Sequence, residues 1–479
     1  MSGATPAGEH RVERDSMGEV RIPSWAYWGA QTQRAVENFG ISSLRIPTAL
    51  LRAIALIKGC AAEANAELRL IPHDIANAIA RAAAEIAEGR WAEHFPVDVF
   101  QTGSGTSWNM NVNEVIANRA NEILGSPLGS RAPVHPNDHV NRCQSSNDVI
   151  PSAIHMANRL AAEPLREVLA ALARAFDDKA KEFGSVLKLG RTHLQDAVPM
   201  TLGQEFSGYA TQVSKGIKRL ESSLPDLEEL ALGGTAVGTG INAHPDFAPR
   251  VIQRIARECG LPFRQADNLF EALACRDAQA GLMAALDVIA GSLLKISFDL
   301  RLLASGPRAG LAEISLPSLQ PGSSLMPGKV NPVIPEMIQQ VALCVKGKCL
   351  TVSMAASMAP LELNVAMPLV AYETLASLEL LTNACVVFCE RCVKGIGADP
   401  EKCGQWIERS LALVTPLAVR IGYDKAAEIV HQAFAEGKTV RQVARERGVL
   451  TTKEADRILD PRAMIRETPP EEAAPGETT

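Results

Sequence analysis

A short segment in the second half of the chain combines hydroxyl groups, one cation and several residues that interrupt regular structure. It reads 322-GSSLMPGKVNP-332, and its polar groups come from Ser323, Ser324, Lys329 and Asn331. Its Gly and Pro residues suit neither a helix nor a strand, so we expect a loop. Two hydroxyls, an amide and a positive charge in one loop favour the binding of an anion.

Three further segments have the same dense, small polar character: 102-TGSGTSWNMN-111, 135-HPNDHVNRCQSSND-148 and 190-GRTHLQD-196. Each lies at an end of a predicted long helix, where free N–H groups and the positive end of the helix dipole favour an anion. The alternative is that these Ser, Thr and Asn residues only cap helices, a role that fits Asn147 and Asp148. Four such loops together favour a small carboxylate over an apolar ligand.

His193, in the third of these segments, is the titrating side chain of most interest. A lone histidine in a loop is commonly a hydrogen-bonded structural residue. If a carboxylate oriented it, however, it could act as a base near neutral pH. Glu336, just beyond the 322–332 loop, is one candidate partner.

Two sequence patterns could indicate a nucleotide site or a metal site, but the surrounding residues argue against both. The glycine-rich run at 232–240, LGGTAVGTG, lacks the GK[ST] ending of a phosphate-binding loop and no βαβ pattern surrounds it. His135 and His139 are four residues apart, but Pro136 predicts a turn rather than one helix face, and HExxH is absent. We therefore expect neither a nucleotide nor a metal.

The trio Cys385, Cys389 and Cys392 has the spacing CxxxCxxC, which some iron–sulfur sites use. No Gly or Pro interrupts this stretch before position 395. On a helix these three positions share one face, so we interpret them as small core residues.

Composition narrows the class of protein. The chain has 479 residues, 47% hydrophobic and 21% charged, which is long enough for about three domains. A net charge of −6 without a basic cluster, and only 4% aromatic residues, argue against nucleic acid as a partner. We see no apolar run long enough to cross a bilayer and no apolar core of a secretion signal near the N-terminus. The sequence thus predicts a cytoplasmic protein.

The elements that must position these loops are mainly helices. The strongest pattern lies in 271–303, where apolar residues step by four and three, as in helices that pack at shallow angles. Long helices are also predicted in 148–183, 200–232, 335–357 and 363–392. Five such segments predict an all-α fold with an elongated central bundle, and bundles of this length commonly complete their core by pairing with other copies.

Shorter helical patterns flank the bundle, in 48–124 and 401–465. We predict an N-terminal helical domain (1–142), a central long-helix domain (143–395), a small C-terminal helical domain (396–466) and a disordered tail (467–479). The tail, ETPPEEAAPGETT, has no aliphatic residue larger than Ala. The first dozen residues are predicted to be loose as well.

At the polar loops the chain resembles the fumarase/aspartase superfamily. Residues 322–331 match its signature G-S-S-x-M-P-x-K-x-N in full. The similarity runs from about residue 11 to residue 464 and includes FQTGSGTS, HPNDHVN, QSSND, GRTHLQDAVPMTLGQE and GGTAVGTG. Family membership implies an all-α homotetramer with a central helical bundle, active sites that draw on three chains, and no metal or organic cofactor.

Several stretches resemble the class II fumarase branch, namely WGAQTQRAVENF, QSSND, GGTAVGTGINAHPDFA and IGYDKAAEI. Other features look more like aspartases or occur in both branches. Examples are His139 where many fumarases have a second Asp, LRLLASGPRAGL at 300–311, and SMAAS at 353–357. The resemblance implies reversible hydration of fumarate to L-malate within the tricarboxylic acid cycle. The alternative function is that of an aspartate ammonia-lyase. A catalytically inactive structural relative is a third interpretation, which is disfavoured because the residues at the catalytic positions are all present.

Carried over by position, the resemblance implies that Ser323 removes a proton from the carbon beside one carboxylate of L-malate, giving an aci-carboxylate. His193, oriented by Glu336, would handle the departing or attacking water. The implied substrate-binding residues are Ser104, Gly105, Thr106, Ser145, Ser146, Asn147, Thr192, Ser324, Lys329, Val330 and Asn331. A second, non-catalytic dicarboxylate site is implied at His135, Pro136, Asn137 and Asp138.

Overall fold

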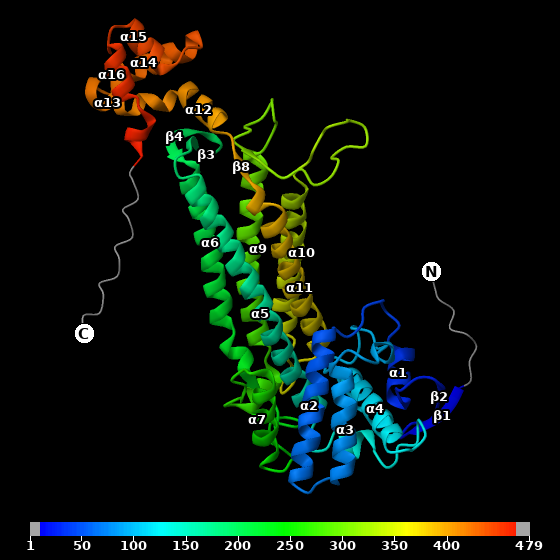
Figure 1. Cartoon of the computed structure of the whole chain (residues 1–479). Helices are drawn as coiled ribbons and strands as arrows, with labels where there is room; N and C mark the ends of the chain where they lie inside the picture. Colours follow the sequence, from blue (N-terminus) through cyan, green and yellow to red (C-terminus); the bar gives the residue numbers. More distant parts are fainter. Residues whose placement is uncertain (1–9, 466–479) are drawn as a thin grey trace, which may run out of the picture. The chain divides into compact units, whose positions relative to one another are not determined.

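A computed structural model describes residues 10–465 (Figure 1). The predicted disordered tail lies outside these residues, as do nine of the twelve N-terminal residues predicted to be loose. The other three, 10–12, belong to strand β1, so that prediction is wrong for them. Helices dominate the described part of the chain, where each of the four sheets has only two strands. The predicted all-α class is confirmed.

All five predicted long helices are present. Their boundaries lie within a few residues of those expected, except that the second ends at Ser223 rather than at 232 and the third begins at Asp277 rather than at 271. The helices are α5 (Ser146–Glu182), α6 (Leu202–Ser223), α9 (Asp277–Leu303), α10 (Val333–Ala356) and α11 (Met367–Arg391). The apolar residues of α9 that step by four and three, such as Leu286 and Leu293, are almost completely buried. The three cysteines in and after α11 are buried too, at 0–2% exposure, which confirms them as core residues.

Two of these helices are unusually apolar. Asp277–Leu303 and the stretch Met367–Gly395 are long and apolar enough to cross a membrane by length and composition, so the expectation that no segment would reach this limit is wrong. Isolated charged residues, such as Asp287 and Lys295 in α9, interrupt the apolar runs of these helices but leave their average hydropathy high. About half of each apolar window is buried inside the chain, as in the core helices of helical bundles.

The chain forms two compact units that each include parts of the long helices. One comprises the described residues through Glu167 with Gly216–Gly291 and Val341–Asn383, and the other comprises Val168–Lys215, Ser292–Gln340 and the described residues from Ala384. These units are discontinuous in sequence, whereas the predicted domains are continuous segments. The units therefore do not test the predicted domain limits, which remain a prediction.

In the first unit, α2 and α3 lie side by side in Figure 1 and α4 packs on them. Strands β1 and β2 form an antiparallel hairpin, β5 and β6 a short parallel pair. The elements of this unit besides the long helices are β1 (His10–Asp15), β2 (Gly18–Pro23), α1 (Ala30–Asn38), α2 (Thr48–Glu67), α3 (His73–Ala87), α4 (Thr106–Ile123), β5 (Glu229–Leu230), α7 (Phe247–Cys259), β6 (Arg264–Gln265) and α8 (Leu269–Ala274). A five-residue π-helix, η2 (Pro136–Val140), follows α4.

In the second unit, aromatic rings of α5, α6 and α11 pack in tilted and edge-to-face contacts that join these helices, with Phe176 in contact with Phe206, Tyr209 and Phe388. The Tyr209 hydroxyl also donates to Asp299 on α9 (3.0 Å). A β-hairpin and small C-terminal helices complete the unit. These elements are β3 (Leu187–Thr192), β4 (Gln195–Thr201), β7 (Ile314–Ser315), β8 (Gly397–Ala398), α12 (Pro400–Arg409), α13 (Thr415–Ile421), α14 (Tyr423–Glu436), α15 (Val440–Glu446) and α16 (Thr452–Ile458).

A mostly buried histidine on α5 makes a testable contribution to stability. Burial, together with the nearby Arg276 guanidinium, lowers the pKa of His155 to about 3. An unfolded chain titrates this histidine at its ordinary value, so unfolding takes up a proton between those two pH values. The contribution of neutral His155 to the free energy of unfolding is fully present above pH ~6.5. As the pH falls below this value, the contribution should decrease by up to about 1.4 kcal/mol for each pH unit.

We expect the thermal midpoint of the protein to drop more steeply between pH 7 and 5, roughly the range over which a histidine titrates, than that of a His155→Gln variant. Thermal unfolding followed by circular dichroism at several pH values measures both slopes. Equal slopes for the two proteins would show that another group controls acid unfolding.

Candidate active site

The segment TGSGT forms the approach to helix α4, which begins at Thr106, so residues 106–111 are helical rather than loop as predicted. Gly105 takes a left-handed conformation (φ 72°) at the N-cap, which turns the chain into the helix. The hydroxyls of Ser104 and Thr106 are hydrogen-bonded at 2.8 Å, and Ser104 is 8% exposed. The two predicted carboxylate-binding hydroxyls are therefore held together beside a helix N-terminus.

Gly103 seats this loop against the segment before α11. The Gly103 carbonyl accepts the backbone N–H of Met367 (3.0 Å), and a Cβ at position 103 would lie 1.9 Å from the Val365 carbonyl oxygen. No side chain fits there without moving the backbone.

We expect Gly103→Ala to displace the loop and raise the KM for substrate at least about tenfold, since misplacing a site residue by ~1 Å is costly. Steady-state kinetics measures this effect. Gly404→Ala is the matched control because a Cβ at that helical glycine meets nothing within 4 Å. An unchanged KM in the Gly103 variant would mean that this loop does not bind substrate.

The segment QSSND starts helix α5. Asp148, fully buried, accepts the N–H of Ser145 (2.9 Å) with one oxygen and those of Gly233 (3.2 Å) and Thr235 (2.9 Å) with the other. Burial raises the pKa of Asp148 to about 6, and these N–H donors partly oppose that shift. The side-chain amide of Asn147 donates to the Ala236 carbonyl (2.8 Å). The glycine-rich run at 232–240 thus braces the predicted binding residues 145–147.

The segment HPND is a single π-helical turn and not the plain turn predicted. His135 Nδ1 accepts the backbone N–H groups of Asn137 and Asp138, both at 3.2 Å, and its Nε2 lies 2.8 Å from Arg131 Nη2. His139 Nδ1 accepts the N–H of His135 (2.9 Å). Burial lowers the pKa of both histidines, and the Arg131 charge lowers that of His135 further. Arg131 therefore adds a positive charge beside His135 of the predicted second site, and no sequence pattern had indicated this residue.

The segment GRTHLQD forms the tip of the β3–β4 hairpin, whereas a helix end was predicted there. His193 and Leu194 both have positive φ (56° and 59°), which makes the tight connection between the strands. Beneath the tip, Arg191 Nη2 contacts Glu313 Oε1 at 2.8 Å. Lys188 Nζ contacts both Glu313 Oε2 (3.3 Å) and Glu205 Oε2 (2.5 Å). Buried charges thus fix the hairpin that carries Thr192 and His193.

The 322–332 segment is a loop before helix α10, as predicted. The loop closes on itself: the Gly322 N–H donates to the Lys329 carbonyl (2.7 Å), and the Asn331 side chain donates to the Gly322 carbonyl (2.6 Å). Ser323 Oγ accepts the N–H groups of Leu325 (3.1 Å) and Met326 (2.9 Å). Ser324, Lys329 and Val330 are exposed, so the loop presents its polar groups to solvent within one chain.

The structure brings the predicted residues together in groups. Ser104 with Thr106, residues 145–147, and the π-helical turn belong to the first unit, whereas Thr192, His193 and the 322–332 loop belong to the second. Glu336 lies 3.5 Å from Arg301, and among residues 10–465 no hydrogen bond or ion pair is seen between Glu336 and His193. The orientation of His193 by Glu336 remains a prediction.

Comparison with known proteins defines the class. Residues 18–347 match the family described as Lyase, and residues 413–466 match the fumarase C C-terminus. The fold is that of two solved structures, each with a TM-score of 0.91. One is a fumarate lyase:delta crystallin from Brucella melitensis bound to cobalt (48% identity, 95% of this chain and 99% of that one), the other the class II fumarase of Schistosoma mansoni (40% identity, the same coverage). The chain is a lyase of the fumarase/aspartase superfamily.

The branch of this superfamily to which the chain belongs is shown by relatives that match it over nearly their whole length. The class II fumarate hydratase of Thermus thermophilus is 50% identical over 461 residues, which cover 96% of this chain and 99% of the relative. That of Halobacterium salinarum is 52% identical over 95% of this chain and 97% of the relative. The chain belongs to the class II fumarate hydratase family.

Proposed function

We propose that the protein catalyses the reversible hydration of fumarate to L-malate. In the dehydration direction, a proton is abstracted from L-malate and its hydroxyl group then leaves as water. The observation that carries this proposal is the 50% identity with class II fumarate hydratases over nearly the whole chain, which includes the complete 322–331 signature. The 322–332 loop, the hairpin tip and the N-termini of α4 and α5 supply the chemical groups.

Ser323 is the proposed base. A serine hydroxyl is too weak an acid to be ionised near neutral pH, so an alkoxide needs strong stabilisation by donors in place before the reaction. The two N–H groups of Leu325 and Met326 already point at Ser323 Oγ and would stabilise such an anion. The alkoxide takes the proton from the carbon next to one carboxylate of L-malate, and the carbanion charge spreads into that carboxylate.

Other groups neutralise the developing charge and bind the substrate. Lys329, in the same loop, lies on the exposed face with Ser324 and Val330. Asn331 holds the loop closed and would reach the aci-carboxylate with its amide. His193, oriented by Glu336, donates a separate proton to the departing hydroxyl, which leaves as water. The carboxylates are bound by Ser104, Gly105, Thr106, Ser145, Ser146, Asn147 and Thr192.

Supplying L-malate and L-aspartate separately tests the reaction. We expect fumarate, followed by the ultraviolet absorbance of its conjugated double bond, from L-malate and none from L-aspartate. Fumarate from aspartate alone would overturn the proposal, and absence of fumarate from both would indicate an inactive relative.

A homotetramer with active sites shared between chains is part of the proposal. Its support is the exposed apolar face of α10, where Leu343, Leu350 and Met354 are 60–66% exposed and spaced as in helix–helix seams. On α9, Phe298 is 54% exposed. Side chains of this kind are expected to be covered by other copies. Sedimentation equilibrium should give the mass of four chains, and a monomeric mass would contradict shared sites.

The second dicarboxylate site and the cytoplasmic location complete the proposal. The Arg131 guanidinium, 2.8 Å from His135 Nε2, supports an anion site at His135, Pro136, Asn137 and Asp138. Many of the relatives named fumarate hydratase are bacterial, which supports a location in the cytoplasm. Cell fractionation with the hydratase assay tests the location.

A further inference from the structure

One lysine of the first unit is completely buried, and the mechanism above does not use it. Lys58 lies on α2 with 0% of its surface exposed. Burying an ammonium group costs far more than burying a methionine or leucine of similar size. A lysine at this position therefore needs a reason beyond filling space.

The Lys58 ammonium holds two side-chain carbonyl groups of the segment before α5. Its Nζ donates to Asn141 Oδ1 and to Gln144 Oε1, both at 2.9 Å. The Gln144 amide in turn donates to the backbone carbonyls of Val140 (3.1 Å) and Arg142 (3.0 Å). The lysine thus fixes which end of each amide faces it and, with it, the shape of residues 140–144.

The same oxygen of Asn141 connects the lysine to a predicted substrate-binding hydroxyl. Asn141 Oδ1 also accepts one N–H of Asn109 (3.2 Å), a fully buried residue of α4. The other N–H of this amide donates to Ser146 Oγ (3.1 Å). Since Ser146 Oγ accepts this bond, its own proton is free to donate elsewhere, as a carboxylate ligand requires.

We infer that Lys58 is a positioning residue, which acts through Asn141 and Asn109 to aim the Ser146 hydroxyl at a substrate carboxylate. This inference rests on the proposed function, in which Ser146 binds substrate. Lys58 touches no substrate itself.

The electrostatic surroundings of the lysine agree with this role. Burial lowers the pKa of Lys58 to about 7, and the Asp148 carboxylate partly opposes that shift. Asn141, Gln144, Asn109 and Asn113 are uncharged, so Asp148 is the one charged side chain identified as acting on it. A protonated lysine strengthens the bond to Asn141 Oδ1, because hydrogen bonds from a cation are roughly twice as strong as neutral ones.

A double-mutant cycle tests the inference. Ser146→Ala should raise the KM for fumarate roughly tenfold with kcat within about twofold, the effect of one hydrogen bond to a charged ligand. Lys58→Met should raise KM by a similar factor. The double variant should show about the KM of Ser146→Ala alone, because both changes remove the same interaction. Multiplied effects, or a normal KM in Lys58→Met, would overturn the inference.

A second pair of variants keeps the test valid if Lys58→Met does not fold. Asn109→Ala removes the link to Ser146 without leaving a buried charge and should reproduce the KM of Ser146→Ala. Asn113→Ala is the matched control: Asn113 donates to the same Asn141 oxygen (3.1 Å) but has no bond to Ser146. Its KM should stay within about twofold of the wild type, well below the roughly tenfold loss expected for a lost bond to a charged group. Equal KM increases in both variants would overturn the inference, whereas a wild-type protein without hydratase activity would instead overturn the proposed function.

Discussion

Replacing Ser323 with alanine is expected to lower kcat for fumarate hydration by a factor of about 10²–10⁴, the usual contribution of a positioned general base. The substitution removes one oxygen atom from a loop whose closure depends on other groups, namely the backbone of Gly322 and Lys329 and the side chain of Asn331. The loop should therefore keep its shape, and KM should change little. Steady-state rates in both directions of the reaction measure the loss.

The adjacent serine provides the control for this prediction. Ser324 is exposed in the same loop. We propose that it contributes its backbone N–H to substrate binding, and an alanine retains this group. Ser324→Ala should therefore keep kcat within about tenfold of the wild type, far from the loss of a catalytic base. Near-normal turnover by Ser323→Ala at saturating fumarate would exclude this serine as the base. Equal losses in both variants would indicate that the loop itself has been disturbed.

Much of the fold could be predicted because a long amphipathic helix has a repeating spacing of apolar residues that is visible in the sequence alone. Seven apolar residues of α9 step by four and three over several turns, and all seven are buried: Leu282, Leu286, Ile289, Leu293, Ile296, Leu300 and Leu303. The hairpin at Leu187–Thr201 was missed because its strands are short, contain Gly190 and Pro199, and adjoin a strong helix pattern. Local sequence signals thus favoured the helix that begins at Leu202.

The site was predictable where residues of one loop act together, and not where partners come from distant segments. The self-closing loop at 322–332 and the pairing of Ser104 with Thr106 involve neighbours in sequence. By contrast, Asp148 was interpreted as a helix cap, yet it also binds N–H groups 85 and 87 residues away. Such contacts depend on tertiary packing, which composition and spacing do not encode. Five buried asparagines on α4, Asn109, Asn111, Asn113, Asn118 and Asn121, were the one available signal of a polar network.

Glu313 is another such distant partner, and its replacement by glutamine should destabilise the protein by about 3–5 kcal/mol, the usual cost of removing one member of a buried ion pair. Glu313 is 0% exposed and contacts both Arg191 and Lys188 at the base of the β3–β4 hairpin. Lys188 keeps Glu205 as a partner in the variant, but no other ion pair is seen for Arg191 among the described residues. The uncompensated arginine charge should push the hairpin away from its present position.

This displacement should also reduce catalysis, because Thr192 and His193 follow Arg191 directly in the chain. We expect kcat/KM for fumarate to fall at least about tenfold, a modest estimate for a site residue misplaced by ~1 Å. Thermal unfolding and steady-state kinetics on the same preparation measure the two effects.

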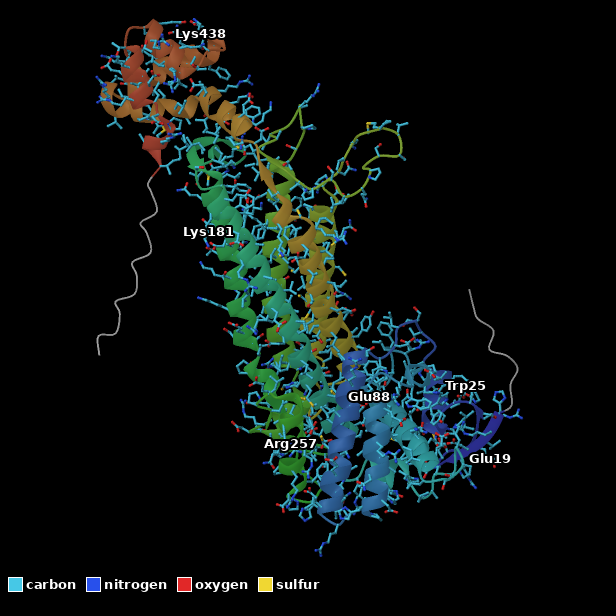
Figure 2. All side chains as sticks on the ribbon, in the orientation of Figure 1. Glu19, Trp25, Glu88, Lys181, Arg257 and Lys438 are labelled. Carbon is cyan, nitrogen blue, oxygen red and sulfur yellow. The ribbon has the colours of Figure 1, made fainter. Side chains whose placement is uncertain are left out.

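Surface ion pairs provide the matched control for Glu313. Figure 2 labels Lys181 on α5 and Lys438 in the connection between α14 and α15, and these lysines pair with Asp177 and Glu436. The Glu390–Lys394 pair is similarly exposed, at 54% for each side chain. Glu390→Gln should therefore cost less than about 1 kcal/mol and leave kcat/KM unchanged, since exposed pairs contribute little. If Glu313→Gln were equally mild, the buried charges would not be what holds the hairpin, and the position of His193 would have to depend on contacts with other chains.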